Sequence, residues 1–534
     1  MKKNKWLISA GILWGLQIIF SIAAIVQLAI LNALPMRYAW LIYIFLILIC
    51  ALSGFGMLFT QNRKQKEPIM IGKWKLPTVK MGKEPLYACR AFGMFLGILG
   101  VLIGVVVVFY IGKLNRTLIN IANPNEQSNR ISVYVLEGSE YEELKDLKNE
   151  KIGFCFAFDE EHIKMAEADL KDELGKDVDI TYFATIVEMV DGLYEGEVDA
   201  IVLNEVYEGL LCEQDEYVNF TTETRKVHTF EYVEKFDDEI EEEEDNRPIT
   251  ERPFVVYISG NDGRTTNLSQ SRSDVNILAV VNPVSKMVLL INTPRDYYVL
   301  TSKAAFWQYD KLTHCGAYGI DCSMDTLGKL YEEEVDYYAQ INFDGFSAVI
   351  DALGGVTVEN DISFTSDDDY FYPKGVVTMD GAHALSFVRE RHSFADGDNQ
   401  RGKNQMKVIK ALIAKAKDST TLLTNYTDIL ASIEGMFLTN VSTQDMADLV
   451  RMQLNDMPDW NVISYSVSGT GASKETFTLP NKKTYVTVPD QASVDKAEEL
   501  IDRVYAGEIL TEEDTIIEDS TTSQGTASQS VTGD

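Results

Sequence analysis

Three long apolar stretches dominate the start of the chain, over residues 6–34, 39–59 and 91–111. A helix needs about 20 mostly apolar residues to cross the roughly 30 Å hydrocarbon core of a bilayer. Each stretch reaches that length. The pattern therefore predicts three membrane-spanning helices within residues 1–114.

Basic residues surround these stretches unevenly. Residues 61–90 carry eight Lys or Arg residues against two Glu residues, and three lysines precede the first stretch, whereas the turn between the first two stretches carries Arg37 alone. Basic loops stay in the cytoplasm, so the N-terminus and residues 61–90 are predicted to be cytoplasmic and the chain after about Lys113 extracytoplasmic. The alternative is that the first stretch is a cleaved signal peptide, but it is long for a signal core and no small-x-small site follows it.

Strands and helices alternate between residues 131 and 233, after a polar segment, residues 115–130, that we interpret as a linker. This alternation, with strands expected at 131–137, 151–156, 179–183 and 198–203 and a first helix over 141–151, predicts an accessory α/β domain. The segments DLKNEKIGF and EMVDGLYEGEVDAIVLNE resemble half of a bacterial extracytoplasmic solute-binding protein. That resemblance implies a ligand cleft between two lobes. The region has residues for one lobe only, so a docking domain without a ligand is the favoured alternative.

Two polar stretches mark further boundaries. Residues 231–245 contain ten acids against the single base Lys235. Like charges repel and stay solvated, so residues 234–251 are predicted to be a linker; calcium binding is a minor alternative, because EF-hand spacing is lacking. Residues 508–534 are rich in Ser, Thr and Glu and are predicted to be a disordered tail.

The region 252–507 has the strongest β pattern. Two apolar runs, residues 275–281 and 286–293, flank Asn282-Pro283 and predict a β-hairpin. Both runs are apolar throughout, which is typical of strands covered on both faces. Strand–helix–strand patterns follow towards residue 507, so the fold class is α/β, with a mixed central sheet in this domain.

Charge changes the functional picture. The formal net charge of −33 argues against non-specific nucleic-acid binding, which needs Lys and Arg to neutralise phosphates. Within this acidic chain, Arg389 and Arg391 alternate and would share a face of an extended segment, and Arg401 and Gln405 are four apart and would share a face of a helix. Guanidinium groups bind phosphate oxygens in bidentate fashion. Taken singly, each of these arginines is more typical of a surface ion pair.

Cysteines and histidines give weaker signals. The four cysteines after the membrane region permit the disulfides Cys155–Cys212 and Cys315–Cys322, and four free thiols are an equal alternative. His314 and His383 are not expected to be ligands or bases. For His392, a position near the site and a position in solvent are equal alternatives.

The motifs ISGND, SRSDVNILAVVNP, LLINTPRDYY, DKLTHCGAYG, NFDGFSAVIDALGGV, MDGAHALSFVRERH and GDNQRGKNQ keep one order along this region. In that order they resemble the catalytic domain of the LytR-CpsA-Psr family. The resemblance implies phosphoryl transfer of a wall glycopolymer. The donor would be a polyprenyl-pyrophosphate-linked glycan and the acceptor a muramoyl hydroxyl of peptidoglycan.

The resemblance also implies roles for single residues. Asp262 and Asp274 match the magnesium-binding acids, and oxygen ligands suit Mg²⁺. The pyrophosphate-binding and catalytic cations are expected to be Arg272, Arg295, Arg389, Arg391 and Arg401. Gln405 belongs to the same set, and Lys311 and Asp398 line or support it. Strands 277–281 and 287–291 would contribute to an apolar tunnel for the lipid. By its place after Arg295, Asp296 could orient the acceptor hydroxyl, or cap a turn.

Two departures from the family pattern stand out. Asn292-Thr293 occupies a place where Ser-Ile is more usual, and Gly402-Lys403-Asn404 lies where a further arginine is common. Both leave the charged ligands in place. Two other functions stay open: a pyrophosphatase acting on the same lipid carrier, and a wall-sensing receptor whose catalytic domain has decayed.

Overall fold

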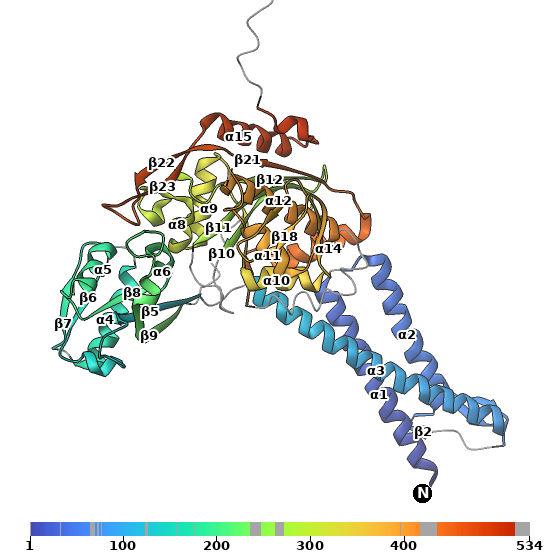
Figure 1. Cartoon of the computed structure of the whole chain (residues 1–534). Coiled ribbons are helices and arrows are strands. Elements are labelled where there is room, and N and C mark those ends of the chain that lie inside the picture. Colours follow the sequence, from blue (N-terminus) through green and yellow to red (C-terminus); the bar gives the residue numbers. More distant parts are fainter. Residues whose placement is uncertain are drawn as a thin grey trace, which may run out of the picture. The chain divides into compact units, whose positions relative to one another are not determined.

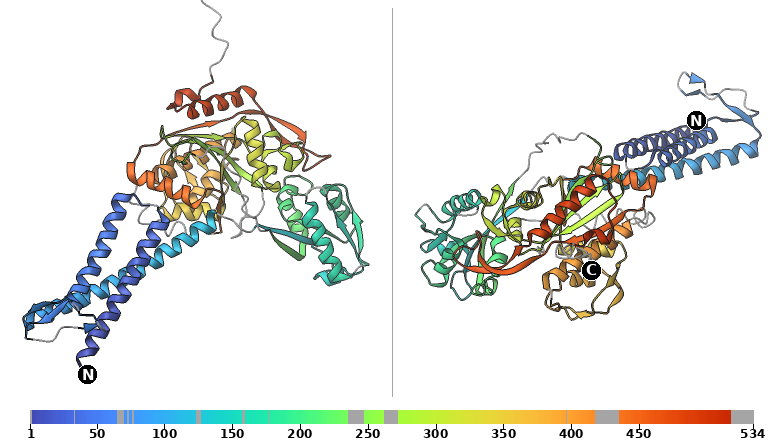
Figure 2. Two further views of the ribbon diagram at one scale, coloured as in Figure 1. Left: turned by 180° about the vertical axis from the view of Figure 1, so that it is seen from behind. Right: turned by 90° about the horizontal axis from the view of Figure 1, so that it is seen from above.

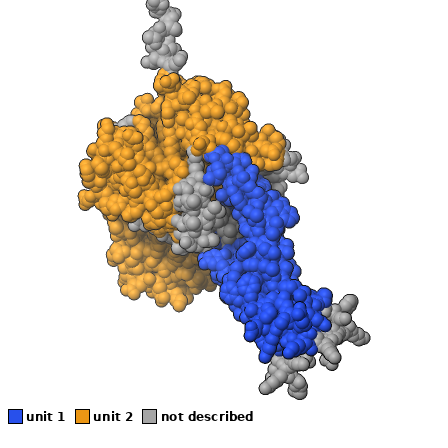
Figure 3. Space-filling view, turned by 90° about the vertical axis from the view of Figure 1, so that its right-hand side faces the viewer, with its two compact units in different colours: residues 1–122, 417–434, 441–458 blue, residues 123–416, 435–440, 459–534 orange. Residues whose placement is uncertain are grey.

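The computed structural model of the chain separates into two compact units, coloured in Figure 3. The first comprises residues 1–122, 417–434 and 441–458, and the second comprises the rest. The residues that the structure describes are 2–32, 34–64, 70–71, 74–75, 77–122, 127–156, 159–175, 177–234, 247–261, 272–395, 397–416 and 435–517.

The first unit is built on three long helices (Figure 1). They are α1 (Lys2–Leu31), α2 (Met36–Leu58) and α3 (Lys83–Ala122). All three are long and apolar enough to cross a membrane, as predicted. Short strand pairs lie between α2 and α3: β1 (Thr60–Asn62) with β4 (Val79–Met81), and β2 (Met70–Ile71) with β3 (Trp74–Lys75).

Small and polar residues hold these helices together. Gly56 and Gly93 bring α2 and α3 so close that a Cβ on Gly93 would lie 2.8 Å from the backbone nitrogen of Met57. Ser53 donates a hydrogen bond to the buried Gln17, and the Trp14 indole donates to the Cys50 carbonyl at 2.9 Å. Close backbone approach and interhelical hydrogen bonds are what drive helix association where no water is present.

The same unit contains α14 (Thr443–Asp456), which lies within the range predicted for the catalytic domain. Arg37, in the first turn of α2, donates to the carbonyl oxygens of Leu454 and Asn455 at 3.2 and 2.8 Å. Arg451 in turn donates to the Asn32 carbonyl at 3.1 Å. A cation at the C-terminus of a helix is favourable because the last carbonyls are unpaired.

The second unit begins with the accessory sheet, of strand order β7-β6-β8-β5-β9. β6 is parallel to β7 and β8, and β5 is antiparallel to β8 and β9. The elements are β5 (Gln127–Leu136), β6 (Lys151–Phe154), α4 (Glu160–Leu174), β7 (Asp179–Tyr182), α5 (Ile186–Tyr194), β8 (Ala200–Asn204), α6 (Val206–Leu211), α7 (Phe220–Glu223) and β9 (Thr224–Glu234).

This region differs from the prediction in three places. α3 continues to Ala122 and β5 begins at Gln127, so regular structure enters both ends of the predicted linker. The predicted helix 141–151 is only the 3₁₀ turn Leu144–Leu147. The prediction also missed β9. The acidic residues 235–246 lie outside the described residues.

A six-stranded mixed sheet forms the centre of the second unit, in the order β20-β15-β10-β11-β12-β21. The predicted hairpin is present, since β11 pairs antiparallel with β12. β15 and β21 join parallel to β10 and β12 respectively. The strands are β10 (Phe254–Asn261), β11 (Ser273–Asn282), β12 (Met287–Asn292), β15 (Tyr337–Asn342), β20 (Phe437–Thr439) and β21 (Asn461–Ser466).

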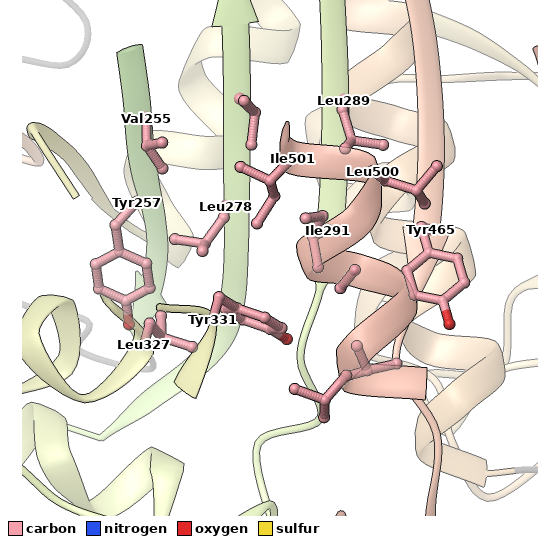
Figure 4. Packing of buried hydrophobic residues seen from close by; sticks show 14 of the residues in the cluster. Val255, Tyr257, Leu278, Leu289, Ile291, Leu327, Tyr331, Tyr465, Leu500 and Ile501 are labelled. Carbon is pink, nitrogen blue, oxygen red and sulfur yellow. The ribbon is translucent and has the colours of Figure 1, made fainter. Parts of the chain in front are cut away.

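Helices cover both faces of this sheet, as the apolar runs predicted. Leu289 and Ile291 face Leu500 and Ile501 of α15 (Gln491–Tyr505) in Figure 4, and Figure 2 shows α15 lying along the sheet. α8 (Leu312–Cys315) and α9 (Ile320–Leu330) contribute to the same core. On the other face, α12 (Gly397–Ala416) packs Met406 on Ile277 and Leu290.

The remaining elements surround the sheet. They are β13 (Tyr298–Leu300), β14 (Tyr309–Lys311), α10 (Phe343–Ala352), β16 (Val356–Asn360), β17 (Phe364–Thr365), β18 (Phe371–Tyr372), β19 (Gly375–Met379), α11 (Gly381–Arg389), β22 (Gly469–Glu475) and β23 (Lys483–Pro489).

The start of the predicted tail is ordered. Leu510 is fully buried, and Arg503 of α15 pairs with Asp514 in the 3₁₀ turn Glu512–Thr515 at 2.8 Å. The predicted disorder therefore begins too early; residues 518–534 lie outside the described residues. All six cysteines are free thiols.

Candidate active site

A cavity of about 1020 Å³ lies in the second unit, beside the strand ends of the central sheet. One part of its wall is charged and another is apolar. Nine of the predicted site residues line it: Arg272, Asp274, Arg295, Asp296, Lys311, Arg389, Arg391, Arg401 and Gln405. Asp398 is ion-paired to Arg401 at 2.6 Å. Asp262 lies outside the described residues.

Asp274 is positioned by the first residues of β11. The buried hydroxyl of Tyr257 donates to Asn276 Oδ1 at 2.7 Å and lies 2.8 Å from Ser273 Oγ, on either side of Asp274 in sequence. The neighbouring β10 shifts register between Gly260 and Asn261. Such irregularities at a strand end re-aim side chains, here at the edge of the cavity.

Arg295 is the centre of the charged wall. Its Nη1 donates to Asp274 Oδ1 at 2.5 Å, and its Nε lies 3.6 Å from Asp296 Oδ1. Burial lowers the pKa of Arg295, but the charges of Asp274, Glu213 and Asp296 raise it by more, so it stands above its usual value. Lys311 Nζ lies 3.3 Å from the same Asp296 oxygen. A preorganised set of cations thus faces the cavity.

Glu213, which the sequence analysis missed, also belongs to this cluster. Its carboxylate accepts hydrogen bonds from Arg272 at 2.9 Å, from Lys311 at 3.0 Å, and from Arg295. Burial raises the pKa of Glu213, but the hydrogen bond from His314 and the charges of Arg295, His314 and Lys311 lower it well below its usual range. In sequence Glu213 is one acid among many, in a segment predicted to be accessory, and no local pattern marks it.

His314 is fully buried between two carboxylates. Its Nδ1 lies 2.6 Å from Asp310 Oδ1, and its Nε2 lies 3.5 Å from Glu213 Oε2. Burial lowers the pKa of His314, but both carboxylates raise it, and the net shift is upward. The two carboxylates therefore favour the charged form of His314.

A second group of cations comes from α11 and α12. Arg389 ends α11 and Arg391 follows two residues later, so the two do not share an extended segment as predicted. Both nevertheless line the cavity, while Glu390 between them is buried. Arg401 and Gln405 share one face of α12, as predicted. Burial raises the pKa of Asp398 and lowers that of Arg401, so the attraction between the two charges does not fully offset the cost of burying them.

The apolar wall opposes the charged one. It is formed by half-buried side chains of the neighbouring strands β10, β15 and β20 and of α10, α11 and α12: Ile258, Ala339, Ile341, Phe343, Phe346, Val349, Leu385, Ile409, Leu412 and Phe437. The predicted tunnel strands 277–281 and 287–291 do not line this cavity. Their side chains are instead sealed in the two cores under the covering helices. The sequence could not separate these cases, because apolar strands inside a sheet and strands beside a cavity have the same composition.

The two departures from the family pattern meet in space. A Cβ on Gly402 would lie only 2.2 Å from Asn292 Nδ2, so the Asn292 side chain fills the space beside α12. Asn292 also donates to Ser466 Oγ at 3.3 Å. A larger residue at 402 would collide with this side chain, so the glycine and the asparagine form a matched pair.

Of the two acids predicted to bind the metal, only Asp274 lies among the described residues. Among the described residues, no three His, Cys, Asp or Glu side chains converge on a point that could hold a metal ion. Asp274 lines the cavity but pairs with Arg295. The described residues thus supply one carboxylate of the predicted pair.

Comparison with known proteins agrees with this site. The profile of the LytR_cpsA_psr family matches residues 217–500. The chain is 31% identical over 249 residues to the polyisoprenyl-teichoic acid–peptidoglycan teichoic acid transferase TagU of Bacillus cereus (strain AH820), covering 46% of this chain and 78% of the relative. It is 35% identical to TagU of Enterococcus faecalis (strain ATCC 700802 / V583), covering 36% of this chain and 63% of that protein. 

A solved structure, "TagT bound to LIIa-WTA", aligns at 27% identity with a TM-score of 0.38, over 48% of this chain and 92% of that chain. The match to the family profile covers more than half of the chain, and the matched part contains every predicted cation of the cavity. On these grounds the protein belongs to the LytR-CpsA-Psr family.

Proposed function

We propose that this protein is a membrane-anchored phosphotransferase that moves a glycopolymer from a polyprenyl-pyrophosphate carrier onto peptidoglycan through a phosphodiester bond. The two-sided cavity carries the proposal. An apolar wall suits an isoprenoid chain, and a wall of arginines suits a pyrophosphate. The names of the relatives favour a teichoic acid as the polymer.

The proposed reaction needs positioning and charge neutralisation more than covalent help. The acceptor hydroxyl oxygen attacks the phosphorus that bears the glycan. A new P–O bond forms, the bridging P–O bond of the pyrophosphate breaks, polyprenyl phosphate leaves, and the hydroxyl proton passes to a base. Arg272, Arg295 and Lys311 would stabilise the phosphates from the buried side. Arg389, Arg391 and Arg401, with Gln405, would hold them from the helix side.

Asp296 is the proposed group for orienting the acceptor hydroxyl. Its side chain is buried in the cavity wall, and its Oδ1 has no hydrogen-bond donor within the described residues, although Lys311 lies 3.3 Å away. A buried carboxylate oxygen without a donor is costly, and an acceptor hydroxyl would satisfy it.

A magnesium ion is part of the proposal. Asp274, together with Asp262, would hold it, and bound Mg²⁺ would add positive charge beside the pyrophosphate. Removal of divalent ions with EDTA is expected to abolish transfer, and added Mg²⁺ to restore it. Full activity in EDTA would remove the metal from the proposal and leave the arginines.

An extracytoplasmic location is supported by charge and by α14. Loop 61–90 is basic, whereas the turn near Arg37 carries little charge. Because basic loops stay in the cytoplasm, this asymmetry favours an extracytoplasmic position for the turn. α14 is bonded to this turn, and in sequence it lies between β20 and β21 of the catalytic sheet. A multi-pass anchor with an external catalytic domain accounts for both facts.

The test is a reconstituted reaction. The full chain in detergent would be incubated with lipid-linked glycan and a peptidoglycan acceptor, and the products separated by mass. A phosphodiester-linked conjugate is expected. Glycan phosphate released equally without an acceptor would favour the pyrophosphatase, and no turnover of bound donor would favour the receptor.

A further inference from the structure

A carboxylate from the accessory region lies in the cation cluster. Glu213 follows α6 by two residues, and β9, the edge strand of the accessory sheet, comes soon after it. Both carboxylate oxygens are used: Oε1 accepts from Arg272 and Arg295, and Oε2 accepts from Lys311 at 3.0 Å. The approach is close, because a Cβ on Gly209 of α6 would lie 3.0 Å from the Arg272 guanidinium.

The segment that carries Glu213 is anchored to the catalytic part. Leu210 and Leu211 of α6 share a core with Ala317, in the 3₁₀ turn Gly316–Tyr318, and with Leu479, which precedes β23. Glu216 pairs with Lys482 beside it. The position of Glu213 among the cations is therefore built by packing around it, and does not depend on one flexible side chain.

Charge balance shows what Glu213 does there. The three cations Arg272, Arg295 and Lys311 face three carboxylates, Glu213, Asp274 and Asp296. With Glu213 in place the charges of the cluster cancel, so an added pyrophosphate would find no unpaired positive charge in it. Without Glu213 the same cluster carries one positive charge without a carboxylate partner.

A carboxylate resembles one face of a phosphate group. Both present two oxygens that bind guanidinium forks in the same bidentate geometry. We propose that Glu213 occupies the place of a donor phosphate, so that the accessory domain competes with the lipid pyrophosphate for Arg272, Arg295 and Lys311 and must withdraw Glu213 before the donor binds. This inference rests on the proposed function of the cavity and adds regulation to it.

The opposite interpretation is that Glu213 permanently orients the arginines for the donor. The two interpretations predict opposite signs for one substitution. Glu213→Gln keeps the shape and removes the charge. If Glu213 competes, pyrophosphate binds the variant more tightly, and if it orients, pyrophosphate binds the variant more weakly.

The experiment is calorimetric titration of the full chain in detergent micelles with inorganic pyrophosphate, in the presence of Mg²⁺. Glu213→Gln is expected to bind on the order of tenfold more tightly than the wild type, a usual size for coupling at one site. Glu213→Asp keeps the charge but shortens the side chain, and should fall between. Glu216→Gln is the matched control. Glu216 lies on the same segment as Glu213 but outside the cation cluster, where it pairs with Lys482, so this variant should bind pyrophosphate as the wild type does.

The outcomes separate the two proposals. Equal or weaker binding by folded Glu213→Gln, with measurable binding by the wild type, would overturn the competition and leave the proposed function standing. No binding by any variant would count against the proposed function itself. Because Glu213→Gln could unfold locally, hydrogen exchange of residues 206–217 in the wild type gives a second measurement: faster exchange on adding pyrophosphate supports withdrawal of Glu213, and unchanged or slower exchange overturns it.

Discussion

Two groups of cations face one cavity, and the fold treats them differently. Arg272, Arg295 and Lys311 are largely buried and paired with carboxylates of three separate segments. Arg389 and Arg391 are exposed at the end of α11, where Arg389 lies 4.7 Å above the Phe343 ring. The first group is rigid because each charge requires its partners. Substitutions there mix stability with activity, whereas substitutions of the exposed Arg389 and Arg391 report activity alone.

The largest effect is expected for Arg295→Gln. It leaves Asp274, Glu213 and Asp296 buried without their shared cation, and breaking a buried ion pair from one side costs about 3–5 kcal/mol. Chemical unfolding of the full chain in detergent should show this loss, together with loss of transfer. Arg503→Gln is the matched control, because Arg503 also pairs with several carboxylates but near the surface, where the cost is about 1 kcal/mol or less. Equal stability of the two variants would contradict the distinction between the groups.

The exposed group is tested by Arg389→Ala. Removing one preorganised donor to a developing charge typically costs about 100-fold in rate. We expect a fall of that size in transfer and in wall-polymer attachment, with unfolding changed by less than about 0.5 kcal/mol. Arg130→Ala removes an exposed arginine of the accessory sheet that does not line the cavity, and should leave transfer unchanged. Normal transfer by Arg389→Ala would exclude this residue from the site.

The matched pair Gly402 and Asn292 tests the scaffold beside both groups. Gly402→Ala should destabilise by about 1–3 kcal/mol, the usual cost of overpacking, because its Cβ would meet the Asn292 amide. Asn292→Ser opens that space, so the double variant should be more stable than Gly402→Ala alone. Gly138→Ala, where no atom lies within 4 Å, is the control. Additive losses in the double variant would show that the two positions are independent.

The smallest effect is a pH dependence of the Glu213–His314–Asp310 contacts. The folded pKa of His314 is raised above 6.5, so its stabilisation is complete below that pH and is lost as pH rises through the folded value. The folded pKa of Glu213 is lowered below 4.5, so its stabilisation is present above that pH and is lost as pH falls through the folded value. Thermal stability attributable to the cluster should therefore be greatest between about pH 4.5 and 6.5.

His314→Gln checks the upper limit of that range. The measured quantity is the slope of melting temperature against pH above pH 6.5, because the chain contains four other histidines. The variant should lose part of the wild-type slope, even if its overall stability is lower. An identical slope would show that His314 does not titrate with the fold.

Much of the fold was predictable because its signals are local. Span length predicted α1, α2 and α3, and two apolar runs around Asn282-Pro283 predicted the β11–β12 hairpin. Errors arose where local pattern and packing disagree. Residues 508–517 look polar and disordered, yet Leu510 is buried, and residues 141–151 look helical but form only a short 3₁₀ turn. Tertiary contacts decide such segments, since their intrinsic preferences are weak.

The candidate site divides in the same way. Its cations were predictable from motifs in a constant order, and the structure brings nine predicted residues to one cavity. Glu213 was not predictable, because it lies in the turn after α6, within the region predicted to be accessory, and four positions before the first residue of the family match. The sequence showed Gly402 and Asn292 as two departures from the family pattern. It did not show that these residues, 110 positions apart, lie against each other.

By itself, the sequence determined three helices long and apolar enough to span a membrane, the α/β class of the central domain and the arginines that line the cavity, because each depends on composition, spacing or motif order along the chain. Only the tertiary structure decided which strands are sealed in the cores, which side chains form the apolar wall of the cavity, and which carboxylate holds the arginines. These features depend on distances between segments far apart in the sequence, and the burial of Glu213 among its cations is the clearest case.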